Sequence, residues 1–481
     1  MQPRSSSEDD KHVLLFEHAS RIASVIREKS REDPVLLATH FDADGLSAGS
    51  IMLGAAYRLG ATVHLRVIDR IDEKILESLE AIQTGLVVFS DIGSGYLDLI
   101  GKILRNRDIV VADHHQPNGD VGHVNHFNPH TLGFNGSEEI SGAGTAYLLA
   151  KALDSRNVDL SPMAIVGALG DQQDKGPQRG FTGLNRGILK DAVEAKLIET
   201  KQDLVFFGRQ TRPVHRAIAS TTDPFLPGLS GEEDRCLALL DAARIPTKVD
   251  DRWRTISDLS LDEKRRIVDK IIENTVSLGH NGDVVMNLIG STYTLLKEDA
   301  GTSLRDAREF GTLLNACGRM NKSGLGIAIG IGDRGESYKA ATEIYGEYKA
   351  TLSKYMNWVA TSPNAYAAHG HIVTVNGNNV IDESMTGAVS SLVSSSKLFG
   401  QDKVTIVRTL TKSGETKLST RATEQLVEKG VNLGLILQNL SAKYPGAIGG
   451  GHAIAAGATV QSGDADRFLV EIEKSIEQVL G

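Results

Sequence analysis

The stretch that decides the fold is "VLLATHFDADGLS", residues 35–47, in which an apolar run ends in His40, Asp42 and Asp44. A short apolar run that is followed by a helical pattern is typical of a strand buried in a parallel sheet. In open α/β sheets, ligands bind at the carboxyl ends of the strands. The two carboxylates and the imidazole are therefore expected at a ligand-binding edge.

Three further apolar runs follow the same pattern. They are "ATVHLRVID", "GLVVFS" and "DIVVA", and each is followed by polar or glycine residues and then by a helical period. This alternation predicts an α/β fold with a parallel sheet and flanking helices. The last two runs lead into "SDIGSG" and "ADHHQP", which place Asp91, Asp113, His114 and His115 just after a strand. Motifs far apart in the sequence are thus expected to meet in one crevice.

Composition narrows the class of protein. A chain of 481 residues with 41% hydrophobic and 23% charged residues predicts a soluble globular protein of two or three domains. The net charge of −9 argues against a general attraction to nucleic acid, but not against a local one. No apolar stretch approaches the roughly 20 residues that span a bilayer, and "MQPRSSSEDDK" lacks an apolar signal region, so we expect a cytoplasmic protein.

Changes of pattern along the chain predict its domains. The charged segment from about 186 to 310 includes the amphipathic helix pattern "SLDEKRRIVDKIIENTVSLG", and "SYKAATEIYGEYKATLSKYMNWVA" predicts one long helix. Strand patterns resume at "HIVTVNG", "DKVTIVRTL" and "ETKLSTR". We therefore expect a catalytic domain over 1–335 with a helix-rich insertion at about 190–310, a connecting helix over 336–362, and a smaller α/β domain over 363–481.

The acidic and imidazole residues after the strands indicate a metal site. Carboxylates this close together repel one another and take up protons or cations. A mixed carboxylate and imidazole set favours Mn²⁺ over Mg²⁺, and two such ions would promote hydrolysis of a phosphodiester or phosphoanhydride. Each motif also has an ordinary alternative, because Asp-x-Asp-Gly and Asp-x-Gly are common in loops and turns.

Together these motifs resemble the DHH phosphoesterase family, which includes RecJ exonucleases, cyclic-dinucleotide and small-oligonucleotide phosphodiesterases, and manganese pyrophosphatases. The motifs occur in the order typical of the family, which is "HFDADG", "SDIGSG", "ADHHQP" and then an aspartate in "GALGDQQD". That aspartate is Asp171, with Asp174 as the alternative. The resemblance implies two divalent ions with Asp91 as the bridge, Asp113 orienting its neighbour, and His115 facing the scissile phosphate. The implied metal ligands are Asp42, Asp44, Asp91, His114 and Asp171, with His40 as a further candidate.

The C-terminal part resembles the family's DHHA1 domain through "GAIGGGHAIAAGA". This implies a glycine turn, Gly449, Gly450 and Gly451, whose N–H groups and His452 hold a substrate phosphate, with an ordinary tight turn as the alternative. Ser419 and Arg421 in "TKLSTRA" would add contacts to the substrate. "LLNACGRMNKSG" resembles a RecJ segment, with Asn315 and Arg319 in the matching places, which implies that both contact the substrate.

The long middle segment makes the chain look closest to archaeal RecJ-like proteins, including the GINS-associated nuclease. That resemblance implies a Mn²⁺-dependent exonuclease that releases nucleotides from single-stranded DNA or RNA in replication or repair. Its expected partners are single-stranded nucleic acid and replisome proteins such as GINS. No association with a membrane is expected. The alternatives are a replisome scaffold with weak or no activity, and an oligoribonucleotide or cyclic-dinucleotide phosphodiesterase. The complete set of ligands favours an active enzyme.

Overall fold

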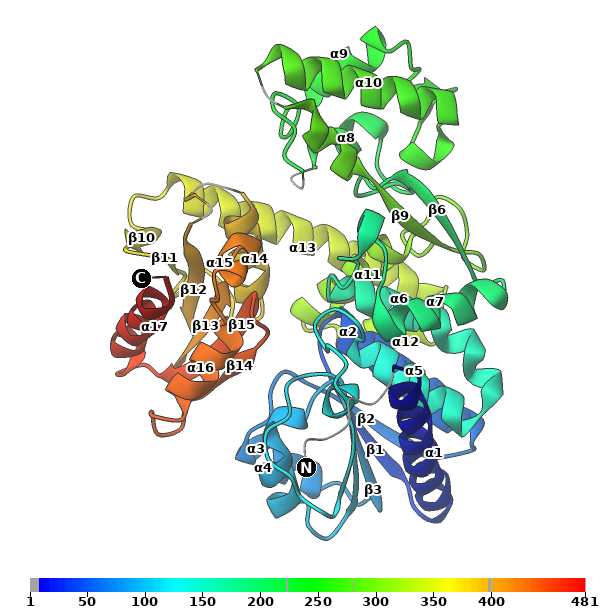
Figure 1. Cartoon of the computed structure of the whole chain (residues 1–481), viewed down its shortest axis with the longest axis vertical. Coiled ribbons are helices and arrows are strands. Elements are labelled where there is room, and N and C mark those ends of the chain that lie inside the picture. The colour runs from blue at the N-terminus through cyan, green and yellow to red at the C-terminus, as the bar shows by residue number, and fades with distance from the viewer. Residues whose placement is uncertain (1–7, 222–223, 280, 397–398, 401, 481) are drawn as a thin grey trace. The chain divides into compact units, whose positions relative to one another are not determined.

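The computed structural model describes residues 8–221, 224–279, 281–396, 399–400 and 402–480. The chain forms two compact units, one of Met1–Gly318 with Lys322–Thr342, the other of Arg319–Asn321 with Glu343–Gly481. Helix α13 (Glu336–Thr361) runs from one unit into the other (Figure 1). The long helix that the sequence predicted here is confirmed.

A parallel sheet lies at the centre of the first unit. Its strand order is β2-β1-β3-β4-β5, and every neighbouring pair is parallel. The chain adds β2 on one side of β1 and the later strands on the other, so the carboxyl ends of β1 and β3 flank the point where ligands bind in such sheets. The strands are β1 (Val35–His40), β2 (Val63–Ile68), β3 (Leu86–Ser90), β4 (Asp108–Ala112) and β5 (Val124–Phe127).

Helices cover both faces of this sheet (Figure 1). On one face, Leu36, Val87 and Val111 pack in a buried cluster with Leu76 and Ile100. The other face is covered by helices that contact one another and the strands. Because both faces are buried, the central strands β1, β3 and β4 are mostly apolar. The first face carries α3 (Glu73–Glu80) and α4 (Leu97–Ile103), and the second carries α1 (Glu8–Glu32), α2 (Ala43–Arg58) and α5 (Gly142–Leu153), with α6 (Ser161–Gly170) and α7 (Gly183–Glu194) beyond them.

An insertion leaves this unit through an antiparallel pair of strands, β6 (Ile198–Leu204) and β9 (Ile289–Leu295). It has a hydrophobic core of its own, in which Cys236, Ile256 and Ile267 are fully buried. The predicted amphipathic helix is confirmed as α10, whose N-terminus is closed by a capping box between Ser260 and Glu263. The elements of the insertion are α8 (Val214–Ala219), α9 (Glu233–Ala242), β7 (Lys248–Val249), β8 (Arg252–Trp253) and α10 (Leu261–Ser277).

The second unit contains a six-stranded mixed sheet in the order β10-β11-β12-β13-β15-β14. Only β11 and β12 are parallel, and α16 and α17 pack against one another over a core that includes Leu418, Leu437 and Phe468. The elements are β10 (Tyr366–His369), β11 (Ile372–Asn376), α14 (Thr386–Ser395), β12 (Val404–Leu410), β13 (Glu415–Arg421), α15 (Glu424–Glu428), α16 (Leu433–Ser441), β14 (Ile448–Gly451), β15 (Ala455–Gln461) and α17 (Ala465–Leu480).

The prediction of a glycine turn in this unit is wrong. Gly449, Gly450 and Gly451 lie in the edge strand β14 and pair with β15, and the chain reverses only at 452–454. Gly449 has a packing reason instead, because a Cβ there would lie 2.3 Å from the Ser441 Oγ of α16. The close approach of helix to strand explains why small residues stand here.

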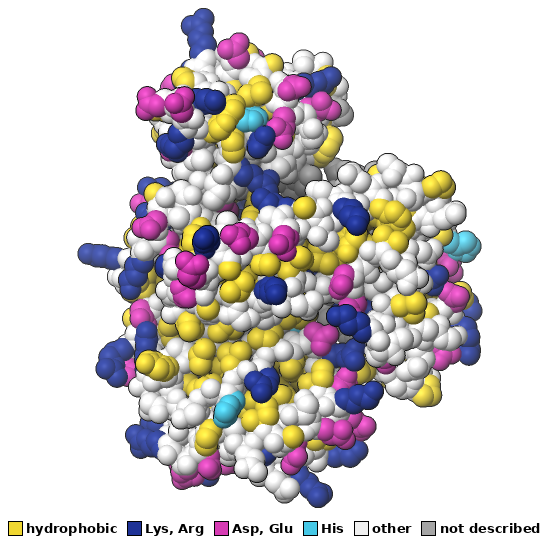
Figure 2. Space-filling model, turned by 180° about the vertical axis from the view of Figure 1, so that it is seen from behind, with side chains coloured by type: hydrophobic (Ala, Val, Ile, Leu, Met, Phe, Trp, Pro, Cys, Tyr) yellow, Lys and Arg dark blue, Asp and Glu magenta, His cyan; other side chains and the backbone are white. Residues whose placement is uncertain are grey.

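The surface shows no bias toward one charge on the face seen in Figure 2, where acidic and basic side chains are interspersed. This distribution agrees with the modest net charge of −9. Among the described residues, no helix is long and apolar enough to cross a membrane. Any attraction to a polyanion must therefore come from a local group of side chains.

Candidate active site

The loop after β1 supplies two carboxylates to the sheet edge. Asp42 caps α2, and its Oδ1 accepts a hydrogen bond from the Gly45 N–H at 3.0 Å. Asp44 lies in the first turn of α2, but its two oxygens accept from the N–H groups of Gly142 at 2.6 Å and Ala143 at 3.0 Å. The N-terminus of α5 thus fixes the Asp44 carboxylate, as expected for an anion at a helix N-terminus.

Asp91 follows β3 in a left-handed backbone conformation, with φ of 60°. Aspartate is one of the few residues that adopt this conformation at small cost. The site is too crowded for side chains on two neighbouring helices, because a Cβ on Gly142 would lie 2.1 Å from the Asp91 Oδ1 and a Cβ on Gly167 would lie 2.4 Å from the Asp44 Oδ1. These two glycines make room for the carboxylates.

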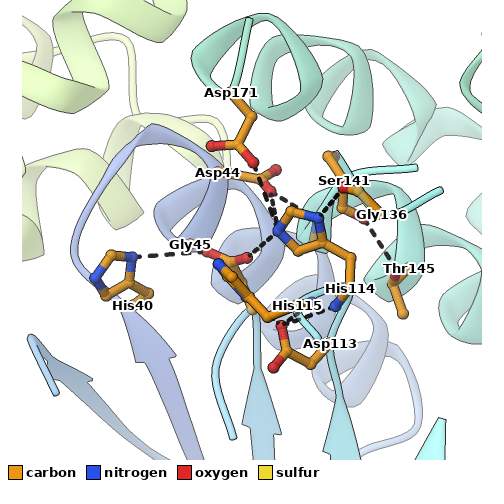
Figure 3. Close-up of polar contacts among 12 residues, drawn as sticks. His40, Asp44, Gly45, Asp113, His114, His115, Gly136, Ser141, Thr145 and Asp171 are labelled. Atoms are coloured by element: carbon orange, nitrogen blue, oxygen red, sulfur yellow. Dashed lines mark hydrogen bonds and ion pairs between the residues drawn. The ribbon is translucent and has the colours of Figure 1, made fainter. Parts of the chain in front are cut away.

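The imidazole of His114 lies at the centre of this group (Figure 3). It is fully buried after β4, and its Nε2 lies 3.2 Å from Asp91 Oδ1, 3.5 Å from Asp171 Oδ2 and 3.7 Å from Asp44 Oδ2. Asp171 is the residue that ends α6. Side chains that follow β1, β3, β4 and α6 therefore converge on one place, as the order of the motifs predicted.

A second group of ligand atoms adjoins the first. The Nδ1 of His40 lies 3.0 Å from Asp42 Oδ2 and 3.8 Å from Asp91 Oδ2. The ligand atoms of His40, Asp42 and Asp91 lie within 4.8 Å of one another, and so do those of Asp44, His114 and Asp171. Asp91 reaches both groups, with Oδ2 toward His40 and Oδ1 toward His114. The arrangement fits two cations with a shared carboxylate.

The electrostatics of the group also fit cations. Burial and repulsion from Asp44 raise the pKa of Asp171 to about 8, and the same two causes raise the pKa of Asp91 well above its usual range. Burial by itself would lower the pKa of His114, but the neighbouring carboxylates raise it well above its ordinary value. The protein thus concentrates more negative charge than its own side chains neutralise, which a divalent cation would relieve.

Asp113 holds the second histidine of the motif. Its Oδ1 lies 2.7 Å from His115 Nδ1 and accepts from the His114 N–H at 2.8 Å. Its Oδ2 accepts from the Ser94 N–H at 2.9 Å. Burial by itself would raise the pKa of Asp113, but His115 and these N–H groups hold it well below its usual range. Asp113 is therefore ionised and fixes the ring of the partly exposed His115.

Several buried polar residues around the site escaped the sequence reasoning. Asn128 donates from Nδ2 to Ser94 Oγ and to the His115 carbonyl, both at 2.8 Å. The Gly136 carbonyl oxygen lies 2.6 Å from His114 Nδ1, and Gln173 Nε2 donates to the same oxygen at 3.0 Å. The "FNP" and "GDQQD" stretches, in which Asn128 and Gln173 lie just after a strand and a helix, were the only signal.

Two predicted residues have other partners. Asp174, the rival to Asp171, forms an ion pair with Arg308 at 2.5 Å and does not belong to either ligand group. Asn315, on α11 (Ala307–Arg319), was predicted to bind substrate, and its Oδ1 accepts from the Ala43 N–H at 3.0 Å. Asn315 thus holds the loop that carries Asp42 and Asp44.

Comparison with known protein families gives two matches. Residues 206–289 match the DHH-CID domain and residues 373–478 match the DHHA1 domain. An uncharacterized protein of Methanocaldococcus jannaschii is 28% identical over 471 residues, which cover 96% of this chain and 98% of that protein. The single-stranded-DNA-specific exonuclease RecJ of Bacillus subtilis is 28% identical over 168 residues, and that of Thermus thermophilus 29% over 207 residues. These segments cover 33% and 40% of this chain, but only 21% and 29% of the two exonucleases.

Solved structures agree with these matches. RecJ from Thermus thermophilus in complex with Mn²⁺ superposes with a TM-score of 0.55 at 16% identity, over 96% of this chain and 55% of that one. CDC45 from Entamoeba histolytica superposes with a TM-score of 0.61 at 11% identity, over 96% of this chain and 99% of that one. Together these matches support a DHH/DHHA1, RecJ-like family for this chain.

The segment that matches the DHHA1 domain contains a half-buried arginine, Arg421, at the end of β13. The Arg421 Nε donates to Ser391 Oγ at 2.8 Å, and Ser419 on the same strand donates to Thr386 Oγ1 at 2.9 Å. Burial lowers the pKa of Arg421 to about 10, and the positive charge of Arg319 adds to this effect. The two guanidinium groups lie near the first turn of α14, and their mutual repulsion favours an anion beside them.

The remaining predicted residue of this domain is His452. It lies in the turn between β14 and β15, where its backbone N–H donates to the Ala455 carbonyl at 2.8 Å. The turn keeps the imidazole next to the edge strand, although the glycines before it are not part of the turn.

Proposed function

We propose that this protein is a Mn²⁺-dependent phosphodiesterase, a RecJ-like exonuclease that releases nucleotides from single-stranded DNA or RNA in replication or repair. The proposal rests on one observation, the meeting of two ligand groups at Asp91. His40 and Asp42 would hold one cation, and Asp44, His114 and Asp171 the other, with Asp91 between them. Imidazole in both groups favours Mn²⁺ over Mg²⁺. Bound cations would lower the pKa of a water and neutralise charge on a phosphoryl group.

The chain's own residues would orient the substrate. Asp113 holds His115 through Nδ1, so Nε2 lies on the opposite edge of the ring and would donate to a phosphoryl oxygen when both ring nitrogens carry a proton. Asp113 stays ionised, which keeps a proton on Nδ1 and the ring in one orientation. We assign His115 to phosphate contact and Asp113 to its positioning.

The DHHA1 domain would bind the nucleic acid backbone. Arg319 and Arg421, with Ser419 nearby, form a local positive group in a chain of net charge −9. Guanidinium groups bind phosphate through paired hydrogen bonds. His452 is the further candidate for a phosphate contact in this domain. A single-stranded substrate agrees with the RecJ relatives, which are single-stranded-DNA-specific exonucleases.

A second candidate is a structural role in a replisome, with proteins such as GINS as partners. It is favoured by the DHH-CID match over residues 206–289 and by the likeness to CDC45. The insertion also exposes apolar side chains that could contact a protein, among them Val249, Trp253 and Leu261. A purely structural protein, however, would need neither the crowded carboxylates nor the glycines that accommodate them. We therefore place catalysis first.

The test is digestion of end-labelled single-stranded DNA and RNA with Mn²⁺, Mg²⁺ or EDTA. Duplex DNA, dinucleotides and a cyclic dinucleotide would be included as competing substrate classes. We expect stepwise release of mononucleotides from single strands with Mn²⁺, and none with EDTA or with Asp44→Asn. Cleavage of only the dinucleotides would instead show a small-oligonucleotide phosphodiesterase. Failure of Mn²⁺-bound wild-type protein to cleave any of them would favour the structural role.

A further inference from the structure

We infer that Gln173 is a positioning residue for the metal ligand His114, acting through the carbonyl group of Gly136. The inference rests on the proposed metal centre and adds to it a residue outside the ligand set. Gln173 is 1% exposed and follows Asp171 by two positions. Its side-chain hydrogen bonds go to Gly136, Ile140 and Asn185, none of which belongs to either cation-binding group, so we place its role in orienting another residue.

The Gly136 carbonyl determines which nitrogen of His114 carries the proton. The Nδ1 of His114 lies 2.6 Å from this oxygen, and a carbonyl can only accept a hydrogen bond. The proton of the neutral ring is therefore on Nδ1, and the lone pair is on Nε2, which faces Asp44, Asp91 and Asp171. Such a hydrogen bond is the usual way in which proteins orient a metal-binding imidazole.

Gln173 holds that carbonyl in place. Its Nε2 donates to the Gly136 carbonyl at 3.0 Å and to the Ile140 carbonyl at 3.1 Å, so one amide ties both ends of the loop before α5. The Oε1 of Gln173 accepts from Asn185 Nδ2 at 2.6 Å, which fixes the direction of the amide group. Gly136 itself must be glycine, since a Cβ there would lie 2.0 Å from the His114 carbonyl oxygen.

The path of the chain links this amide to a second ligand. Asp171 ends α6, Gln172 takes a left-handed conformation with φ of 55°, and the N–H of Gln173 donates back to the Ala168 carbonyl at 3.0 Å. Three consecutive residues thus supply one ligand and orient another. Asp171 and His114 are coupled through this turn.

The test is calorimetric titration of the metal-free protein with Mn²⁺. Gln173→Met keeps the size of the side chain without its donor, and Gln173→Glu keeps its shape but replaces the donor with an oxygen. We expect the affinity of one of two Mn²⁺ sites to fall about 10- to 100-fold in both variants, the range typical of lost hydrogen bonds to metal-binding histidines. The matched control is Gln172→Asn at the exposed neighbour, where asparagine tolerates the left-handed backbone.

A double-mutant cycle distinguishes positioning of His114 from a general structural role. If Gln173 acts through His114, then Gln173→Met should change Mn²⁺ affinity no further in a His114→Ala background. Equal losses in both backgrounds, an equal loss at both Mn²⁺ sites, or wild-type affinity in folded Gln173→Met would overturn the inference. Thermal unfolding of each metal-free variant shows which are folded. If wild-type protein binds no Mn²⁺, or His114→Ala binds it normally, the proposed metal centre fails first.

Discussion

Glu309 gives the protein a pH-dependent stability that one substitution should remove. This carboxyl group lies at the start of α11 and is 4% exposed. Its oxygens accept from the Gln210 N–H at 2.8 Å and the Thr211 hydroxyl at 2.5 Å, which attaches the first loop of the insertion to α11. Burial, with repulsion from Asp306, raises the pKa of Glu309 from 4.5 to about 7.

The sign of the effect follows from proton binding. The folded protein binds this proton more tightly than the unfolded chain, so the stabilisation is complete below pH 4.5 and is lost as the pH rises through 7. A shift of this size corresponds to about 3 kcal/mol of unfolding free energy, at about 1.4 kcal/mol for each pH unit. Glu309→Gln keeps the shape and an acceptor oxygen but has no proton to lose.

The assay is urea denaturation of wild type and Glu309→Gln in EDTA between pH 4.5 and 8. The unfolding free energy of wild type minus that of the variant should fall by about 3 kcal/mol across this range. Glu336→Gln at an exposed position is the matched control for the substitution itself. Parallel curves for wild type and Glu309→Gln would refute the reasoning.

Three other substitutions test the site. Asp44→Asn should abolish hydrolysis and weaken Mn²⁺ binding without unfolding the protein, because it removes a ligand and also relieves repulsion; wild-type turnover would contradict this. Gly142→Ala should lower Mn²⁺ affinity at least tenfold, since its Cβ would displace Asp91. Gly187→Ala is the control, because a Cβ there meets nothing within 4 Å, and it should stabilise α7 by about 0.5–1 kcal/mol. Arg421→Gln should weaken binding of single-stranded DNA and reduce its salt dependence, as filter binding over a salt series would show, with Mn²⁺ stoichiometry unchanged.

The strands and the ligand-type residues were predictable because their signals are local. Each of β1, β3 and β4 is a continuous apolar run, and the acidic or imidazole residues follow directly. Strand β5 was not predicted, because "VNHF" is short and half polar and is held by pairing with β4. Strand β6 was missed for a similar reason, since most of its side chains are exposed.

Features that depend on distant neighbours escaped the sequence. Gly449 leaves room for α16, which packs closely on β14, and no short stretch of sequence reveals which helix covers a strand. In the sequence, Gln173 and Asn128 look like ordinary polar loop residues, because their hydrogen-bond partners are visible only in the structure. Their importance comes from burial, which turns an unremarkable amide into a group that must be satisfied.

The β6 and β9 ribbon has a consequence for how such proteins can diversify. Leu204 and Ile289 are paired residues on adjacent strands, so the chain departs for the insertion and comes back at the same point. The segment between Leu204 and Ile289 could be exchanged for a short hairpin or for a different domain without changing the path of the rest of the backbone. Evolution, or a protein engineer, can therefore replace the insertion and keep the candidate metal site of the first unit intact.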